Sequence, residues 1–242
     1  MPHTLFISDL HLSADQPRSM AAFRRFIAEL APQAEALYIL GDLFEYWAGD
    51  DDLDDAFHSE VATILRNLAE RGTQLFLMPG NRDLLMGEAL ANACHATLLN
   101  DPALIDLYGT PTLLSHGDIL CTGDAEYQRY RAQVHDVEFQ QQFLAQPLTE
   151  RKACIAQLRS RSTAEKQGKD SATMDVSDET VAALLRKHGY PRLIHGHTHR
   201  PNRHEHEVDG HHCERWVLGD WHQTGSALRC DSSGINWEAI PG

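Results

Sequence analysis

The chain has 242 residues, of which 42% are hydrophobic and 23% are charged, and its formal net charge is −14. This length can bury one substantial core, and the acidic balance excludes a general nucleic-acid binder, whose binding surface would be basic. No apolar run approaches the ~20 residues that a membrane-spanning helix needs, and the first residues lack the basic stretch of a signal peptide. The five cysteines are dispersed and odd in number, which favours free thiols in a reducing cytoplasm over a disulfide framework.

Short apolar runs alternate with helix-prone stretches along the first part of the chain. We predict strands at 4–7, 36–40 and 74–78, with helices at 18–30 and 54–70 between them. The helix at 54–70 begins at a run of aspartates from 50 to 55, which we interpret as a solvated helix start. This run lacks the Gly and the terminal Glu of an EF-hand calcium loop.

The middle of the chain changes character. Residues 124–169 are helix-prone and are interrupted only at Pro147. They predict a helical cap that is inserted into a core formed by residues 1–123 and 170–242. The cap carries several basic and large apolar side chains, and a solvated helix face or packing within the cap would explain them as well as a binding surface does. These residues are Arg151, Lys152, Arg159, Arg161, Lys166, Lys169, Phe139, Phe143, Leu144, Ile155 and Leu158.

The last part of the chain returns to strands. We expect strands at 112–114 and 192–194, and a helix that is capped by Ser177 and runs to Lys187. Three short alternating regions then follow, around 203–208, 214–218 and 226–237, and they predict a second sheet that packs on the first. The fold class is therefore α/β, a two-sheet sandwich flanked by helices.

Five short segments rich in oxygen and imidazole side chains follow the predicted strands. They are Asp9-Leu10-His11, Gly41-Asp42, Gly80-Asn81-Arg82-Asp83, His116-Gly117-Asp118 and His197-Thr198-His199. Each segment alone is typical of a turn, a helix start or, in a chain with 15 histidines, chance. Neighbouring strands of an α/β sheet converge at their carboxyl ends, so the whole set in this order indicates a metal site at one rim of the sheet.

The number of candidate ligands favours two metal ions over one. The seven candidates are Asp9, His11, Asp42, Asn81, His116, His197 and His199, which is more than one ion with open water positions can use. A central carboxylate such as Asp42 can bridge two ions. Because no cysteine lies in these segments, the ligands suit Mn²⁺, Fe²⁺, Zn²⁺ or Mg²⁺ rather than Cu(I) or an iron–sulfur cluster.

This ordered set resembles the calcineurin-like metallophosphoesterase superfamily, whose pattern is D-x-H, G-D, G-N-H-D/E, a further His and G-H-x-H. The match runs from Asp9 to His199. The resemblance implies two divalent ions, for which we expect Mn²⁺. It also implies how the ligands divide: Asp9, His11, Asp42 and His199 for the first ion, and Asp42, Asn81, His116 and His197 for the second.

One position departs from the wider superfamily. Most members carry His directly after the Asn of the third segment, where this chain has Arg82. Arginine does not release a proton near neutral pH, so it cannot protonate a poor leaving group such as an alkoxide. A guanidinium can neutralise a phosphate that leaves as a stable anion. Arg82 therefore favours cleavage of a phosphoanhydride over cleavage of an ordinary phosphomonoester.

The amino-acid sequence of four segments is similar to that of one branch of the superfamily, the pyrophosphatases of lipid A biosynthesis. These segments are 41–47, 80–83, 115–118 and 195–201. The resemblance implies hydrolysis of UDP-2,3-diacylglucosamine to UMP and 2,3-diacylglucosamine 1-phosphate (lipid X), through a metal-activated water that attacks the alpha phosphorus. Asn81 and Arg82 would then be catalytic, and His195 would be structural or would support a ligand. The implied substrate contacts are Asn81, Arg82, Asp124, Ser162, Lys166, Lys169 and His197.

Such a substrate carries two acyl chains, so we expect a peripheral membrane protein at the cytoplasmic face of the inner membrane, with an apolar lip of the cap as the contact. No obligate protein partner is inferred. The alternatives are a soluble phosphodiesterase or phosphoprotein phosphatase of the same superfamily, a non-catalytic scaffold, and a metal-storage or sensor protein. Arg82 weighs against the first and the last, and the complete ligand set weighs against a scaffold.

Overall fold

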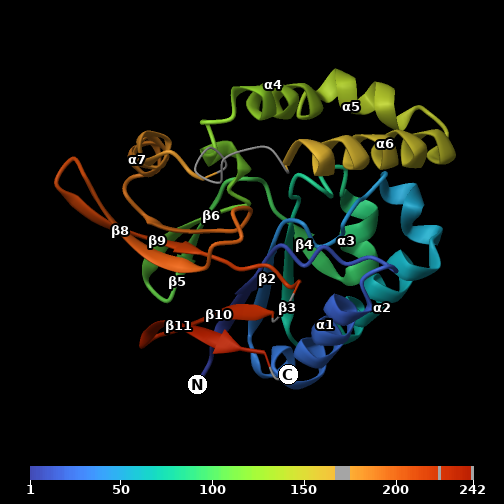
Figure 1. Cartoon of the computed structure of the whole chain (residues 1–242). Coiled ribbons are helices and arrows are strands. Elements are labelled where there is room, and N and C mark those ends of the chain that lie inside the picture. The colour runs from blue at the N-terminus through green and yellow to red at the C-terminus, as the bar shows by residue number, and fades with distance from the viewer. Residues whose placement is uncertain (167–174, 223–224, 241–242) are drawn as a thin grey trace.

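The computed structural model describes residues 1–166, 175–222 and 225–240, without the side chains of 161–166, and contains two sheets (Figure 1). The six-stranded sheet has the order β11-β10-β1-β2-β3-β4 and the five-stranded sheet the order β5-β6-β7-β9-β8. The first consists of β1 (Thr4–Ile7), β2 (Ala36–Leu40), β3 (Gln74–Met78), β4 (Ala96–Leu98), β10 (Ser226–Asp231) and β11 (Gly234–Ala239). The second consists of β5 (Ala103–Leu107), β6 (Thr110–Ser115), β7 (Arg192–His195), β8 (Asn202–Val208) and β9 (His211–Val217).

The helices are distributed over both outer faces and one end of this sandwich. They are α1 (Pro17–Glu29), α2 (Ala56–Glu70), α3 (Glu88–Cys94), α4 (Ala125–Val134), α5 (Val137–Leu144), α6 (Leu148–Lys166) and α7 (Asp178–Lys187). Three short 3-10 helices accompany them: η1 (Ala31–Gln33), η2 (Asp50–Asp54) and η3 (Asp118–Leu120). Figure 1 shows α1, α2 and α3 on the face of the first sheet that points away from the second sheet.

The alternation of side chains along β1 shows why two sheets can share one core. Leu5 and Ile7 point into an apolar cluster with residues of α1 and α2, whereas Phe6 points to the other face. There Phe6 packs in one cluster with Ile194 and Trp216 of the second sheet. A strand that is buried on both faces needs a nearly continuous apolar run, and three of the four buried residues of β1 are apolar.

The strand predictions are confirmed for the three apolar runs in the first part of the chain. The three strands at 4–7, 36–40 and 74–78 have the predicted bounds, and the predicted sandwich of two sheets is present. The assignment of the last strands was wrong, because β10 pairs antiparallel with β1 and so extends the first sheet rather than the second. β4 and β5 were not predicted.

The region predicted as a cap contains α4, α5 and α6, which lie together at the end of the molecule opposite the N-terminus (Figure 1). The prediction of a single interruption at Pro147 was wrong, because the helical structure is also interrupted just before Asp136. The Asp136 side chain accepts a hydrogen bond from Phe139 N at 2.9 Å and so begins α5. Among the described residues, none of the helices combines the length and hydropathy that a bilayer-spanning segment requires.

The aspartate run 50–55 is only in part the solvated helix start that the sequence predicted. Asp52 is fully buried, and its Oδ1 lies 2.5 Å from Lys152 Nζ of α6. Asp50 accepts hydrogen bonds from backbone N–H groups at the start of α3, and only Asp55 caps α2 as expected, by accepting from Phe57 N at 3.0 Å. Ser177 stands at the predicted start of α7, but its side chain makes no capping hydrogen bond.

Candidate metal centre

The five segments meet at the rim formed by the ends of β1, β2, β3, β6 and β7. Backbone hydrogen bonds join the segments directly to one another: Asp9 N donates to Gly41 O at 3.1 Å, and His11 N donates to Asp42 O at 3.0 Å. Strand pairing ends at this rim. Beyond it, these hydrogen bonds between loops hold the neighbouring segments together. They fix the positions from which the polar side chains project.

Left-handed backbone conformations gather at the same rim. Among the described non-glycine residues, nine have a positive φ, and five of these are predicted ligands. Those five are Asp9 (55°), His11 (49°), Asp42 (52°), His197 (68°) and His199 (55°). Each such residue costs about 1–3 kcal/mol, and strain of this kind persists only where the surrounding structure imposes it. Concentrated strain of this kind is typical of a functional site.

One half of the site brings two imidazoles and two carboxylates together. His11 Nε2 lies 3.4 Å from His199 Nε2 and 3.8 Å from Asp42 Oδ2. Asp9 Oδ1 lies 3.2 Å from His199 Nε2, and this buried oxygen makes no regular hydrogen bond with any described residue. Imidazole nitrogens and carboxylate oxygens that converge on one point fit a divalent cation between them.

The other half is built around an amide oxygen. Asn81 Oδ1 lies 2.9 Å from His197 Nδ1 and 3.0 Å from His116 Nε2. Asp42 Oδ1 lies 3.7 Å from His116 Nε2, so the two oxygens of this carboxylate face the two halves separately. The structure therefore brings all seven predicted ligands together, with Asp42 in the middle. Their oxygen and nitrogen donors suit borderline divalent ions.

The electrostatics favour a cation at His116 and His199, whereas burial and the charge of His116 lower the pKa of His197 to about 3. Burial lowers the pKa of His116, but the charges of Asp42, Asp9 and Asp118 outweigh it and raise that pKa to about 9. Burial also opposes ionisation of His199, whose contacts with Asp220 and Asp9 nevertheless raise its pKa to about 10. Imidazoles that hold a proton this firmly occupy a field in which a metal ion would be stabilised, with release of protons when it binds.

Three carboxylates outside the predicted set support the ligands. Glu45 Oε2 lies 3.0 Å from His11 Nδ1, and Asp220 Oδ2 lies 3.0 Å from His199 Nδ1. Asp83 is buried and accepts hydrogen bonds from the backbone N–H groups of Gly80 and Asp42. Burial and the charge of Asp42 raise the pKa of Asp83 to about 6. Such contacts orient metal-binding imidazoles and loops.

These supporting residues differ in whether sequence reasoning could have found them. Glu45 follows Asp42 by three positions within a segment already singled out, and Asp83 belongs to the third segment. Asp220 and His222 carry no motif. His222 stacks on His11 with ring centroids 5.4 Å apart, and it forms a possible metal-holding group with His11 and His199. Only the fold brings 220–222 to this rim.

Arg82 and the start of α4 flank the centre. Arg82 N donates to Asp42 Oδ1 at 2.8 Å, and Arg82 Nη1 lies 3.8 Å from Glu45 Oε1. Burial raises the pKa of Glu45, but the contact with His11 and the charge of Arg82 outweigh it and lower that pKa to about 2. The Tyr127 ring of α4 stacks on the His197 ring at 5.8 Å between centroids. The first helix of the predicted cap therefore reaches the centre.

The remaining predicted site residues fall in three groups. Asp124 stands at the N-cap of α4 and accepts a hydrogen bond from Tyr127 N at 3.0 Å. His195 is fully buried, and its ring nitrogens lie 2.9 Å from Gly196 O and 3.2 Å from Arg215 Nη1, which fits the structural role predicted for it. Three predicted substrate contacts lie outside the residues whose side chains the structure describes: Ser162, Lys166 and Lys169.

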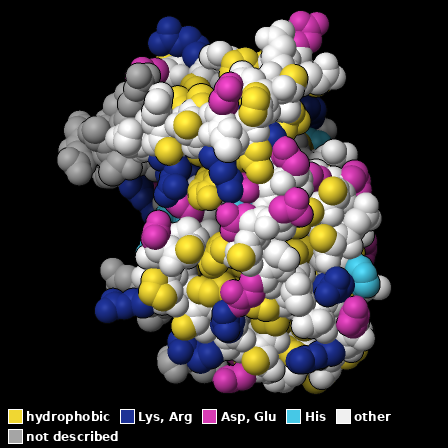
Figure 2. All heavy atoms as spheres, turned by 90° about the vertical axis from the view of Figure 1, so that its right-hand side faces the viewer, with side chains coloured by type: hydrophobic (Ala, Val, Ile, Leu, Met, Phe, Trp, Pro, Cys, Tyr) yellow, Lys and Arg dark blue, Asp and Glu magenta, His cyan; other side chains and the backbone are white. Residues whose placement is uncertain are grey.

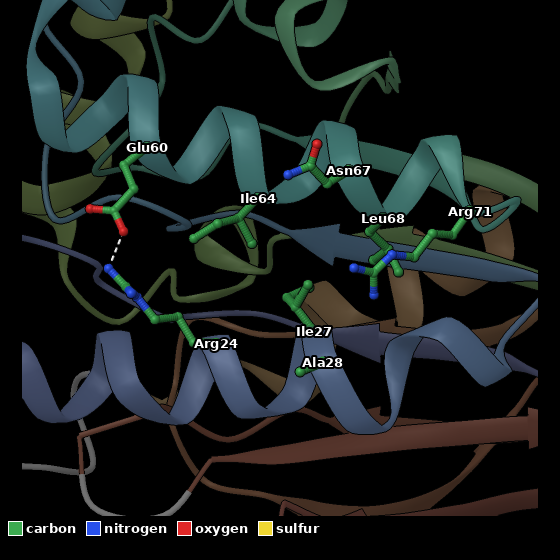
Figure 3. A pocket seen from close by; sticks show the side chains of 8 residues that line it. All are labelled: Arg24, Ile27, Ala28, Glu60, Ile64, Asn67, Leu68 and Arg71. Atoms are coloured by element: carbon green, nitrogen blue, oxygen red, sulfur yellow. Dashed lines mark hydrogen bonds and ion pairs between the residues drawn. The ribbon is translucent and has the colours of Figure 1, made fainter.

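Two other features of the described chain do not compete with this centre. Asp52, Asp55 and His58 have ligand atoms close enough for a metal, but Lys152 Nζ lies 2.5 Å from Asp52 Oδ1 and supplies the cation. A shallow pocket of about 260 Å³ lies between α1 and α2, where an ion pair between Arg24 and Glu60 spans one end (Figure 3). That pocket contains no cluster of carboxylates and imidazoles.

Comparisons with known proteins identify the family of the chain. A UDP-2,3-diacylglucosamine hydrolase from Aromatoleum aromaticum is 54% identical over 233 residues, which cover 95% of this chain and 94% of the relative. A protein of the same name from Edwardsiella ictaluri is 49% identical over 239 residues, which cover 98% and 92%. The family model described as calcineurin-like phosphoesterase matches residues 2–201, a range that includes all seven candidate ligands. The chain belongs to the calcineurin-like phosphoesterase family.

Proposed function

We propose that this protein hydrolyses the pyrophosphate bond of UDP-2,3-diacylglucosamine, in lipid A biosynthesis. The products are UMP and 2,3-diacylglucosamine 1-phosphate, and the enzyme class is a metal-dependent pyrophosphatase. The observation that carries the proposal is that relatives with this name are 47–54% identical to the chain over nearly its whole length. The chemistry of the candidate metal centre is consistent with it.

The ligands would divide between two ions along the two halves of the site. Asp9, His11 and His199 would hold one ion, Asn81, His116 and His197 the other, and Asp42 would bridge them. We propose Mn²⁺ as the metal, since imidazole and carboxylate donors of this kind suit it. When bound, the ions supply a nucleophile at neutral pH and stabilise the charge that develops on the phosphorus attached to uridine.

Arg82 supplies the charge that the leaving group needs. The bond that breaks joins two phosphates, so the departing group is a stable anion and requires neutralisation rather than protonation. The backbone N–H of Arg82 donates to Asp42 and fixes the Arg82 main chain beside the proposed bridge between the ions, while its guanidinium lies 3.8 Å from Glu45 Oε1. Asn81 and His197 would lie nearest the bound phosphates, and Asp124 marks the side of the site where α4 begins. Ser162, Lys166 and Lys169 complete the proposed set of contacts.

Residues 124–169 would serve as a cap for the acyl chains and as the membrane contact. Their helices expose large apolar side chains, among them Val137 at 64%, Leu144 at 42% and Leu158 at 39%. Figure 2 shows hydrophobic side chains at the upper end of the molecule, with basic side chains beside them. An apolar lip with adjacent basic residues supports peripheral attachment to the anionic cytoplasmic face of the inner membrane.

An assay with two substrates tests the proposal. The purified protein is given UDP-2,3-diacylglucosamine or bis-p-nitrophenyl phosphate in the presence of Mn²⁺, and UMP release is compared with nitrophenol release. We expect the nucleotide lipid to be hydrolysed far more efficiently, and chelation of the metal to stop the reaction. Preference for the simple diester would contradict the proposal and would favour a soluble phosphodiesterase.

A further inference from the structure

Glu45 stands where the candidate metal centre, Arg82 and the cap meet. Its Oε2 lies 3.0 Å from His11 Nδ1. Its Oε1 lies 3.0 Å from Arg159 Nη2 of α6 and 3.8 Å from Arg82 Nη1. The side chain is only 12% exposed, so solvent screens these charges weakly. One carboxylate thus contacts a proposed metal ligand, a proposed catalytic arginine and an arginine of the cap.

The backbone around Glu45 is fixed to two of these partners. Glu45 N donates to the carbonyl oxygen of Leu12, the residue that follows His11, at 3.0 Å. Two residues beyond Glu45, Trp47 N donates to Arg82 O at 3.2 Å. The main chain at Glu45 is therefore fixed relative to both loops, and the side chain that projects from it is largely buried.

The two oxygens of Glu45 contact different partners. Oε2 faces His11 Nδ1, which leaves Nε2 of the same ring to face His199 at 3.4 Å. A carboxylate behind an imidazole fixes the ring and raises its basicity toward a metal. Oε1 faces two guanidinium groups, so the local charge of this trio is positive. A positive trio beside the metal site is suited to an anionic pyrophosphate.

The other ion pairs of α6, among the side chains that the structure describes, do not have this connection. Arg151 pairs with Asp51, and Lys152 pairs with Asp52, both on η2. Neither aspartate contacts a proposed metal ligand. Arg159, by contrast, also lies over the Tyr46 ring, with its Cζ 5.6 Å from the ring centroid, so it docks onto the segment that holds Glu45.

We propose that Glu45 is a positioning residue that sets His11 for metal binding and couples this to the seating of Arg159 and Arg82. The inference deepens the proposed function and rests on it for the identity of the substrate. It assigns to Glu45 an effect on metal affinity that an ordinary ion pair between helices would not have.

Mn²⁺ titration followed by electron paramagnetic resonance of the free ion tests the metal part without any substrate. Glu45→Gln removes the charge and keeps an acceptor, whereas Glu45→Ala removes both. We expect Mn²⁺ affinity to fall by about 10-fold in the first and toward about 100-fold in the second, the range for residues that orient ligands. Asp51→Asn, which weakens another ion pair of α6, is the matched control and should bind Mn²⁺ like the wild type. Wild-type affinity in both Glu45 variants would overturn the proposal.

A double-mutant cycle with Arg159→Gln tests the coupling to the cap. If Glu45 seats Arg159, the loss of kcat on UDP-2,3-diacylglucosamine in Glu45→Gln/Arg159→Gln should be smaller than the product of the single losses. Multiplicative losses would overturn the coupling. A wild-type protein that does not hydrolyse this substrate would refute the proposed function, while the Mn²⁺ affinities would still decide the role of Glu45.

Discussion

The rim of the sandwich and the helices α4–α6 are built on opposite principles. At the rim, polar side chains are buried, the backbone is strained and loops are bonded directly to one another. In α4 and α5 no residue is buried, and α6 is attached to the core chiefly through ion pairs of Arg151, Lys152 and Arg159. A buried, strained geometry is thus separated from exposed helices that are attached by ion pairs, and substitutions in the two regions should have different effects.

The largest effect is expected at the centre of the rim. Asp42→Ala should abolish turnover and lower the bound metal below two ions per chain, because without the bridge two cations repel each other. Metal analysis after gel filtration and a UMP-release assay check this, with Asp15→Ala, an exposed aspartate, as the control. Two retained ions with a near-normal rate would refute a dinuclear centre.

Arg82→Ala should damage the chemistry and spare the metals. Loss of a preorganised charge at the leaving group should reduce kcat by about 10²–10³-fold, while metal content stays near that of the wild type. Arg82→His should not restore activity on the anhydride, since a proton donor is not what this leaving group needs. The exposed Arg18→Ala serves as the control. Loss of metal from Arg82→Ala would show that this residue is structural.

Replacing residues 124–169 with a short linker should separate the two regions. None of the proposed metal ligands lies in that segment, so the shortened protein should still bind metal. Its activity on the lipid nucleotide should fall by about 100-fold, because the substrate is no longer held in register, and its salt-sensitive sedimentation with anionic vesicles should weaken. A shortened protein that keeps its activity on the lipid nucleotide and still sediments with the vesicles would show that the cap does not bind the acyl chains.

Lys152→Met should affect stability rather than chemistry. It leaves the buried Asp52 carboxylate without its cation. We expect a loss of about 2 kcal/mol in the free energy of unfolding, below the value for fully buried pairs because the Lys152 side chain is 31% exposed. Denaturant unfolding measures the loss, and Mn²⁺ affinity should not change. Asp52→Asn in the same chain should recover most of the stability; no recovery would mean that the pair is not the cause.

The smallest effect is expected at the start of α5. Asp136→Ala removes the side chain that accepts a hydrogen bond from Phe139 N. Loss of such an N-cap hydrogen bond costs about 1 kcal/mol. Since α5 belongs to residues 124–169 and not to the rim, metal binding should not change. Comparison with Gln133→Ala, a substitution at an exposed residue of α4, isolates the capping term. Any loss of bound metal in Asp136→Ala would contradict the separation of the two regions.

The sequence by itself determined the parts of this protein that depend on neighbours along the chain. Apart from Thr4 and Gln74, the strands at 4–7, 36–40 and 74–78 consist of hydrophobic residues, most of which are buried, and such runs can be recognised without a structure. The candidate ligands follow strands because polar residues are tolerated where a buried strand ends. Those two local rules indicated a compact set of candidate site residues, and the resemblance of their ordered pattern to a known superfamily indicated the family.

The tertiary structure decided what depends on residues far apart in the chain. Short alternating strands fit either sheet, so only pairing with β1 placed β10 and β11. The burial of Asp52 depends on Lys152, 100 positions away, and the contacts of Asp220 and Glu45 with the ligand histidines depend on how loops from distant segments meet. Periodicity and propensity are short-range signals, whereas ion pairing and sheet order are properties of the folded chain as a whole.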